Sequence, residues 1–180
     1  RGTPLSRYRD HEPSPANVQA PRDPVWAQVI AEDGSWGLGL TGFGDPVAKV
    51  IDGHLAPLLG GQDCFATQMS SDVMWRATAS YGSTGLAACA ISAVDLALWD
   101  LVGKLLQQPV YRLLGGPSHP AVRCYATSDD LDWSRQLGFT SFKISNSWSP
   151  IDGRRGLRDM EAHVANARKV VGDDADLSIN

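Results

Sequence analysis

The sequence predicts an α+β first part followed by the start of an α/β second part. Two short strand patterns separated by a tight turn stand before residue 42, and helical periodicity follows in 45–59 and 84–106. From about residue 121 the order of patterns becomes strand, helix, strand, helix, strand. This order at short spacing is typical of parallel βαβ units with right-handed crossovers.

The chain begins with an irregular arm and a candidate hairpin. Residues 1–24 contain five of the eleven prolines and show neither helical nor strand periodicity. Val25–Ala31 is a strand pattern that ends at the turn 32–34, and Ser35–Thr41 is the candidate partner strand. The glycines of this second strand weaken the prediction, because a glycine offers no side chain to pack.

Two helices are expected between the hairpin and residue 80. Asp45 stands before a proline in the arrangement of an N-cap residue and a first-turn proline, and apolar residues then recur at helical spacing. Gly60 and Gly61 follow the last apolar position and end this first helix. Residues 65–78 form a second and weaker helical pattern.

The strongest predicted helix spans 84–106. Its apolar residues lie on one face, and Lys104 near the carboxyl end complements the helix dipole. Asp95 and Asp100 lie inside this apolar helix, but a spacing of five does not place them squarely on one face. We therefore assign both residues to the scaffold and not to a metal site.

The second part contains three short strands and two helices, and it is incomplete as a sheet. Three parallel strands leave an open edge and an uncovered face, whereas a (β/α)8 barrel takes roughly 250 residues. We therefore expect the sheet or barrel to continue beyond Asn180. The predicted elements are Val122–Ala126, Asp129–Leu137, Phe139–Ile144, Gly156–Val171 and Asp176–Ile179.

Composition excludes several classes of protein. With 43% hydrophobic residues, 20% charged residues and a net charge of −4, the 180 residues can form a core. The absence of a basic stripe argues against a nucleic-acid or anionic-membrane partner, and no apolar run is expected to span a membrane. Cys64, Cys89 and Cys124 are odd in number and widely spaced, which favours free thiols in a reducing cytoplasm.

One long segment carries a resemblance to a known family. Residues 90–104 read AISAVDLALWDLVGK, and PV at 109–110 and LLGG at 113–116 follow. This run resembles the signature of the mandelate racemase and muconate lactonizing branch of the enolase superfamily. The flanks TPLSRYRD at 3–10, YAT at 125–127 and WSP at 148–150 resemble the L-rhamnonate dehydratases and related acid-sugar dehydratases of that branch.

The resemblance implies a fold and a division into domains. It implies an α+β capping domain followed by the start of an α/β (β/α)7β TIM-like barrel, truncated after about three strands. Residues 1–117 would form the capping domain, with its first part missing, and 118–180 the incomplete barrel domain.

The resemblance also implies a chemistry. The family removes the weakly acidic proton next to a carboxylate, and a divalent cation, usually Mg²⁺, stabilises the resulting enediolate. Lys143 matches the first lysine of the family's Lys-x-Lys motif, where it would neutralise the substrate carboxylate or a metal-bound oxygen. Ser145 stands at the second lysine position, so no lysine base is expected there. Asn180 aligns with the first metal-binding aspartate but brings no negative charge.

Further residues are candidates for substrate contact. Arg7, Arg9 and His11 lie in an arm that resembles the capping loop at the barrel mouth, and arginine suits carboxylate and hydroxyl-rich ligands. Pro15 falls where the rhamnonate group tends to carry another arginine, which leaves the identity of the sugar acid open. Trp148 follows the second barrel strand and would form a pocket wall or fill the core. Spacing alone supports no Ser/His/Asp or Cys/His set.

Three functions stay open at this point. The first is an Mg²⁺-dependent dehydratase of a small-molecule acid sugar, homo-oligomeric as a whole protein and inactive as this 180-residue chain alone. The second is a racemase, epimerase or cycloisomerase of the same superfamily. The third is a non-catalytic homologue, in which apolar surface on an unfinished barrel would promote self-association.

Overall fold

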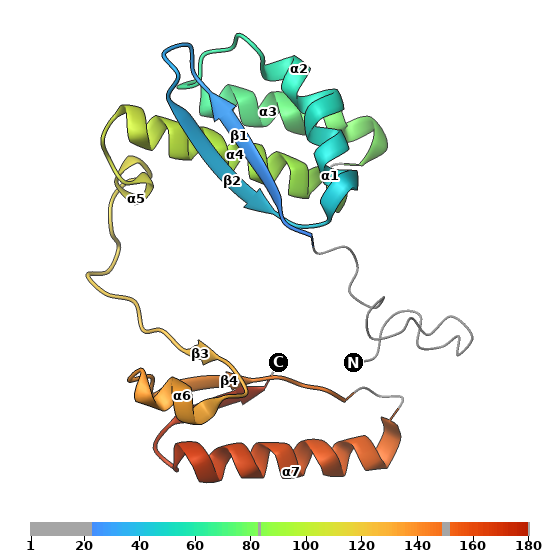
Figure 1. Ribbon diagram of the computed structural model, residues 1–180, viewed down its shortest axis with the longest axis vertical. Helices are drawn as coiled ribbons and strands as arrows, with labels where there is room; N and C mark the ends of the chain where they lie inside the picture. Colours follow the sequence, from blue (N-terminus) through green and yellow to red (C-terminus); the bar gives the residue numbers. More distant parts are fainter. Residues whose placement is uncertain (1–22, 83, 149–151, 180) are drawn as a thin grey trace. The chain divides into compact units, whose positions relative to one another are not determined.

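The computed structural model describes residues 23–82, 84–148 and 152–179 (Figure 1). The predicted arm lies almost entirely outside the described residues. The chain divides into two compact units with the boundary between Ser118 and His119.

The first unit combines one hairpin with a set of helices. An unbroken helical stretch runs from residue 44 to 59, with a π-helical turn in its middle. The elements are β1 (Val25–Ile30), β2 (Trp36–Thr41), α1 (Gly44–Val50), η2 (Ile51–Leu55), α2 (Ala56–Leu59), α3 (Thr67–Thr78), the 3₁₀ turn η3 (Ala79–Tyr81), α4 (Leu86–Leu105) and α5 (Val110–Leu113).

The predicted hairpin is present. β1 and β2 pair antiparallel in continuous register, from Val25 opposite Thr41 to Ile30 opposite Trp36. The turn is closed by a hydrogen bond in which the Ala31 N–H donates to the Ser35 carbonyl at 2.8 Å.

The glycines of β2 have a packing function. A Cβ atom on Gly37 would lie 2.1 Å from the Ala97 carbonyl oxygen, and one on Gly39 would lie 1.8 Å from the Ala93 carbonyl oxygen. Both carbonyls belong to α4, so β2 lies directly on the helix backbone (Figure 1). The residues that weakened the strand prediction are therefore the ones that allow this contact.

Two side chains of α4 bind backbone groups of β2. Asp100 Oδ2 accepts a hydrogen bond from the Leu38 N–H at 2.8 Å. Lys104 Nζ donates to the Trp36 carbonyl at 3.0 Å and to Asp100 Oδ2 at 2.7 Å, and it lies 3.9 Å from the centroid of the Trp36 ring. Asp100 thus has the scaffold role that its place in the helix indicated.

The core of the first unit is built around α4. Hairpin, α1 and α3 side chains pack against its buried face. The buried core residues are Ala27, Val47, Leu55, Met74, Ala90, Ile91, Ala93, Val94, Ala97 and Leu98.

The length and composition of α4 correct one expectation from the sequence. By these two criteria alone the helix could cross a membrane, although no apolar run of that kind was expected. Core helices of soluble proteins meet the same criteria, and 56% of the most apolar 18-residue stretch of α4 is buried.

The start of α1 differs from the prediction. Asp45 is not the N-cap residue, because the helix already begins at Gly44 and its cap position is Phe43, with φ of 73°. The Gly44 N–H donates to the Asp23 carbonyl at 3.1 Å, so a backbone carbonyl from before β1 takes the place of a capping side chain. Asp45 lies in the first turn, where a carboxylate complements the helix dipole.

The second unit is a small parallel sheet with βαβ crossovers, as predicted. The strand order is β3-β4-β5, and both pairs of neighbours are parallel. The elements are β3 (Ala126–Thr127), α6 (Leu131–Gln136), β4 (Ser141–Ile144), α7 (Gly153–Val171) and β5 (Asp176–Ile179).

The first of these strands was predicted wrongly. The pattern indicated a strand over Val122–Ala126, whereas β3 contains only Ala126 and Thr127. These two residues pair with Phe142 and Lys143. By this register Tyr125 falls opposite Ser141, where β4 begins, so the described residues before Tyr125 have no strand opposite them, and Val122 is 79% exposed.

The close contact between β2 and α4 generates a prediction. Gly39→Ala should lower the free energy of unfolding by about 3 kcal/mol, because the new methyl group would clash with the rigid backbone of α4. The matched control is Gly53→Ala, where a Cβ meets nothing within 4 Å. Urea unfolding should show no loss for the control, and equal stability of both variants would contradict the contact.

Two acidic residues of α4 have pKa values shifted in opposite directions. Burial raises the pKa of Asp95 above its ordinary value. Burial acts in the same sense on Asp100, but hydrogen bonds from Lys104 and the Leu38 N–H outweigh it and lower the pKa of Asp100. The ionised form is therefore disfavoured at Asp95 and favoured at Asp100.

These shifts predict opposite pH dependences of stability. The contribution of Asp100 is present above its unfolded pKa of about 3.9 and is lost as pH falls through the folded value. Asp100→Asn should therefore destabilise at pH 7, by no more than about 1 kcal/mol because the side chain is 38% exposed. Asp95 costs stability as pH rises through its raised folded pKa, so Asp95→Asn should stabilise at pH 7.

Urea unfolding of both variants at about pH 3 and pH 7 checks these signs. The two differences from the unsubstituted chain should have opposite signs at pH 7 and shrink at pH 3. Effects of equal sign at pH 7 would contradict the assignment of Asp100 to the hairpin contact.

Candidate functional site

The carboxyl ends of the three parallel strands form one edge of the second unit. β3 ends at Thr127, β4 at Ile144 and β5 at Ile179. In sheets with helical crossovers, the loops at this edge are where ligand sites form. Residues just after the strands are therefore the candidates for chemistry.

Lys143 lies one residue before the end of β4. Its register partners are Thr127 on β3 and Ser178 on β5, and its side chain is half-buried. The Ser128 N–H donates to the Lys143 carbonyl at 3.1 Å, which extends the pairing of β3 with β4 by one residue. The structure thus places Lys143 in the middle of the sheet near its carboxyl edge, and its substrate role stays a prediction.

The sheet has one apolar face and one polar face. Phe142 and Ile144 pack in the core with Ala167 and Val171 of α7, and Leu177 packs against the same cluster. The alternating positions Ser141 and Lys143 therefore belong to the opposite face. By register, Thr127, Asp176 and Ser178 lie on this face as well.

This polar face changes one expectation. A sheet with helices on one side only was expected to expose apolar surface that would need covering. At the described positions, the residues of the face opposite the helices are threonine, serine, lysine and aspartate instead. The strand residues of this face are therefore more polar than expected, while self-association of the chain stays a prediction.

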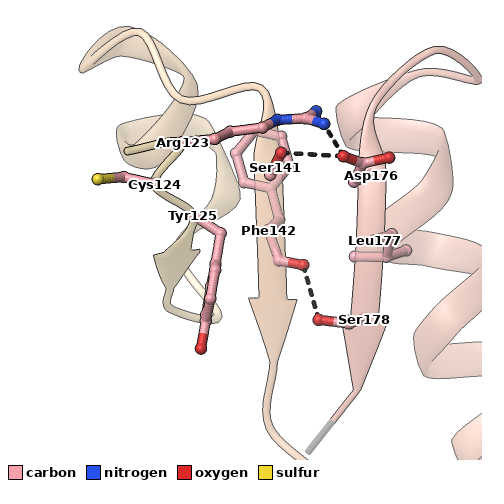
Figure 2. Close-up of a pocket in the computed structure, with 8 residues that line it drawn as sticks. All are labelled: Arg123, Cys124, Tyr125, Ser141, Phe142, Asp176, Leu177 and Ser178. Atoms are coloured by element: carbon pink, nitrogen blue, oxygen red, sulfur yellow. Dashed lines mark hydrogen bonds and ion pairs between the residues drawn. The ribbon is translucent and has the colours of Figure 1, made fainter. Parts of the chain in front are cut away.

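A hollow of about 260 Å³ lies toward the other end of the strands (Figure 2). Ser141 and Asp176 begin β4 and β5, and Ser141 Oγ donates to Asp176 Oδ2 at 3.1 Å. Arg123 forms an ion pair with the same oxygen at 2.5 Å. In (β/α)8 barrels the active site forms at the carboxyl ends of the strands, so we assign this group at their amino-terminal ends to the scaffold.

A second polar group stands directly beyond the carboxyl ends of β3 and β4. Asp129 Oδ1 accepts a hydrogen bond from the Ser145 N–H at 2.9 Å, and Asp129 Oδ2 accepts one from Ser145 Oγ at 2.5 Å. His163 on α7 brings Nε2 to 3.8 Å from Asp129 Oδ1. Sequence reasoning missed this group, because its members are 16 or more residues apart. Only the positions of Asp129 and Ser145 after predicted strands could have indicated it.

Trp148 lies at the edge of this group. Its ring packs against the His163 ring with centroids 5.4 Å apart and planes inclined by 57°. The Trp148 N–H donates to Asn146 Oδ1 at 3.0 Å. A role of Trp148 as a pocket wall stays a prediction.

Four other predicted site residues belong to segments outside the described part of the chain. They are Arg7, Arg9, His11 and Asn180. Among the residues that are described, no group of three or more His, Cys, Asp or Glu side chains could hold a metal ion. Lys143 and Trp148 are therefore the two predicted site residues whose surroundings are known.

Comparison with known proteins places the chain in a family. Residues 18–115 match the mandelate racemase / muconate lactonizing enzyme, N-terminal domain. An L-rhamnonate dehydratase of Saccharopolyspora erythraea is 39% identical over 96% of this chain. A putative L-rhamnonate dehydratase of Caldivirga maquilingensis is 40% identical over the same share. The chain covers 44% of each of these two relatives.

Solved structures agree with this placement. L-rhamnonate dehydratase from Gibberella zeae matches with a TM-score of 0.81 and 33% identity, covering 87% of this chain and 40% of that one. The same enzyme complexed with Mg matches with a TM-score of 0.80 and 34% identity, over 87% of this chain and 38% of that one. The 3,6-anhydro-D-galactonate cycloisomerase from Zobellia galactanivorans matches with a TM-score of 0.75 and 30% identity, over 84% of this chain and 44% of that one.

The family match covers the hairpin, the apolar helix and the glycines after it, which are the elements of the first unit. The first unit is therefore an N-terminal capping domain, and the chain belongs to the mandelate racemase / muconate lactonizing enzyme family of the enolase superfamily.

Proposed function

We propose that the whole protein is a dehydratase of an acid sugar, similar to L-rhamnonate dehydratase. The observation that carries this proposal is the 39% identity with an L-rhamnonate dehydratase over 96% of the chain. Because the chain spans 44% of that relative, the proposal concerns the whole protein and not these 180 residues alone.

The proposed reaction is the elimination of water from a 2,3-dihydroxy acid. A base removes the proton on the carbon next to the carboxylate, and the hydroxyl on the neighbouring carbon leaves as water. The resulting enol takes up a proton at that neighbouring carbon and becomes a 2-keto-3-deoxy acid. The negative charge that develops on the carboxylate oxygens is what the protein must stabilise.

Lys143 is the described residue best suited to that charge. It lies near the carboxyl edge of β4, in the middle of the polar face, between Thr127 and Ser178. Its ammonium would bind the substrate carboxylate, and this interaction would strengthen as the carboxylate oxygens become more negative. Ser145 is not proposed as the base, because its hydroxyl donates to Asp129.

Magnesium enters the proposal through the relatives. One of the matched structures is a rhamnonate dehydratase complexed with Mg. The described residues of this chain contain no group of three acidic, His or Cys side chains that would hold the ion. We therefore propose a magnesium requirement for the whole protein, with Asn180 at the position of one ligand, and assign no step of the reaction to the metal.

The remaining substrate contacts are proposed from the resemblance. Arg7, Arg9 and His11 would reach the hydroxyls and carboxylate of the sugar acid from the capping domain. Trp148 would form part of the pocket wall, which its packing on His163 at the strand ends supports. We also propose a cytoplasmic homo-oligomer that acts on a small molecule and binds neither nucleic acid nor membrane.

An isomerase of the same superfamily is the second candidate. The cycloisomerase of Zobellia galactanivorans matches the fold with a TM-score of 0.75. An isomerase would begin with the same removal of a proton but would return an acid of unchanged composition. A product lighter by one water therefore distinguishes the dehydratase from this alternative and from a non-catalytic homologue.

The role of Lys143 generates a prediction for the whole protein. Lys143→Met should reduce turnover of L-rhamnonate at least about 100-fold, because the side chain keeps its length but loses the charge that meets the developing anion. The measurement is formation of the 2-keto acid in the presence of Mg²⁺. Lys169→Met, on the exposed last turn of α7, is the control and should leave turnover unchanged. Equal losses of turnover in both variants would contradict the proposed role of Lys143 in the site.

A second prediction concerns the 180-residue chain itself. We expect no Mg²⁺-dependent formation of 2-keto acid by this chain, because its described residues offer no metal-binding group. Isothermal titration with MgCl₂ in the same buffer should show no binding heat above that of dilution. Metal-dependent turnover by the purified chain, abolished by a chelator, would contradict this expectation.

A further inference from the structure

We infer that Asp129 is a positioning residue that clamps the end of β4 to the end of β3 and so holds the strand end that carries Lys143. The role given to Lys143 rests on the proposed function. The clamp itself rests on contacts within the second unit.

Both side-chain oxygens of Asp129 are engaged with one residue. Ser145 donates its N–H to Oδ1 at 2.9 Å and its hydroxyl to Oδ2 at 2.5 Å. Two hydrogen bonds to the two oxygens of a carboxylate fix both the distance and the orientation of the donor residue. Ser145 is the first residue after β4, and Asp129 is the second after β3, so the contact joins two adjacent strand ends.

The carboxylate continues the pairing of the strands beyond the sheet. The last backbone contact between them is the hydrogen bond from the Ser128 N–H to the Lys143 carbonyl at 3.1 Å. The next N–H on this side, just after the end of β4, belongs to Ser145. The Asp129 carboxylate accepts its hydrogen bond in place of a backbone carbonyl. The carbonyl of Lys143 and the N–H of Ser145 are therefore both held by the segment that follows β3. Lys143 shares a side of the chain with Ser145, because side chains alternate along an extended chain.

On the side of α7, His163 lies next to the Asp129 carboxylate. His163 Nε2 lies 3.8 Å from Asp129 Oδ1, beyond hydrogen-bonding distance. This nitrogen is buried and has no hydrogen-bond partner among the described residues, and the Trp148 ring packs on the imidazole. His163 thus encloses the carboxylate without orienting it.

The geometry assigns a structural use to the Ser145 hydroxyl. A serine nucleophile needs a base that accepts its proton and a third group that orients the base. Here the carboxylate stands between the serine and the histidine, and no hydrogen bond joins Ser145 to His163 among the described contacts. The three residues therefore hold a strand end and do not form a nucleophile and its base.

Amide hydrogen exchange on the 180-residue chain tests the clamp. In Asp129→Ala the amide at position 145 should exchange at least about tenfold faster than in the unsubstituted chain, because its charged acceptor is gone. Asp129→Asn should restore most of the protection, since an amide can accept the N–H through its oxygen and donate to Ser145 Oγ. Asp132→Ala, an exposed carboxylate in the first turn of α6, is the control and should change nothing.

The effect on Lys143 needs its own readout. The chain has only four lysines, so reductive ¹³C-methylation gives four resolvable side-chain signals in addition to the amino terminus. The Lys143 signal, identified by its loss in Lys143→Arg, should shift in Asp129→Ala and in Ser145→Ala and return toward its original position in Asp129→Asn. Lys49 and Lys169 signals should stay where they are.

Three outcomes decide the proposal. Faster exchange at residue 145 together with a shifted Lys143 signal, both reversed in Asp129→Asn, supports the clamp. Unchanged exchange in Asp129→Ala, or an asparagine variant no better than alanine, overturns it. If Asp129→Ala does not fold, Asp129→Asn and Ser145→Ala decide by the Lys143 signal. No turnover enters these readouts, so they remain valid if the dehydratase proposal fails.

Discussion

The first unit depends on the direct contact between the backbone of β2 and the backbone of α4. Gly37 and Gly39 permit this contact, because any side chain there would overlap the carbonyl oxygens of Ala97 and Ala93. Once the strand lies on the helix, Asp100 and Lys104 reach its backbone groups, and the apolar face of α4 is buried beneath the hairpin. The most apolar helix of the chain thus becomes the centre of a capping domain.

In the second unit, a side chain supplements backbone pairing at the strand ends. Its sheet is short, with only two residue pairs between β3 and β4, so backbone pairing alone holds the ends weakly. The carboxylate of Asp129 adds two hydrogen bonds just past the last backbone one. This matters for function because Lys143, the charged strand residue near that edge, needs a fixed direction to stabilise a developing anion. Side chains of the opposite end, such as Asp176 and Arg123, secure the sheet there.

Much of the fold could be predicted, and the failures have physical reasons. The hairpin and α4 follow from local periodicity, and β5 has the predicted bounds. The cap of α1 could not be foreseen, because its acceptor is the carbonyl of Asp23 on the far side of the hairpin. β3 was misplaced because its length depends on where β4 begins. Of the candidate site, Lys143 could be proposed from its place in a motif. The pairing of Asp129 with Ser145 could not, since it depends on the register of two strands joined through a helix.

The central claim is that the whole protein removes the proton next to a carboxylate and expels water. The most direct test is to incubate it with Mg²⁺ and each of a set of acid sugars, L-rhamnonate among them, in D₂O and to record the mass spectrum of the acids. The account predicts a keto acid that is lighter by one water and carries deuterium on the carbon that lost its hydroxyl. Unchanged composition of every acid in the set, whether with deuterium next to the carboxylate or without any, would contradict it.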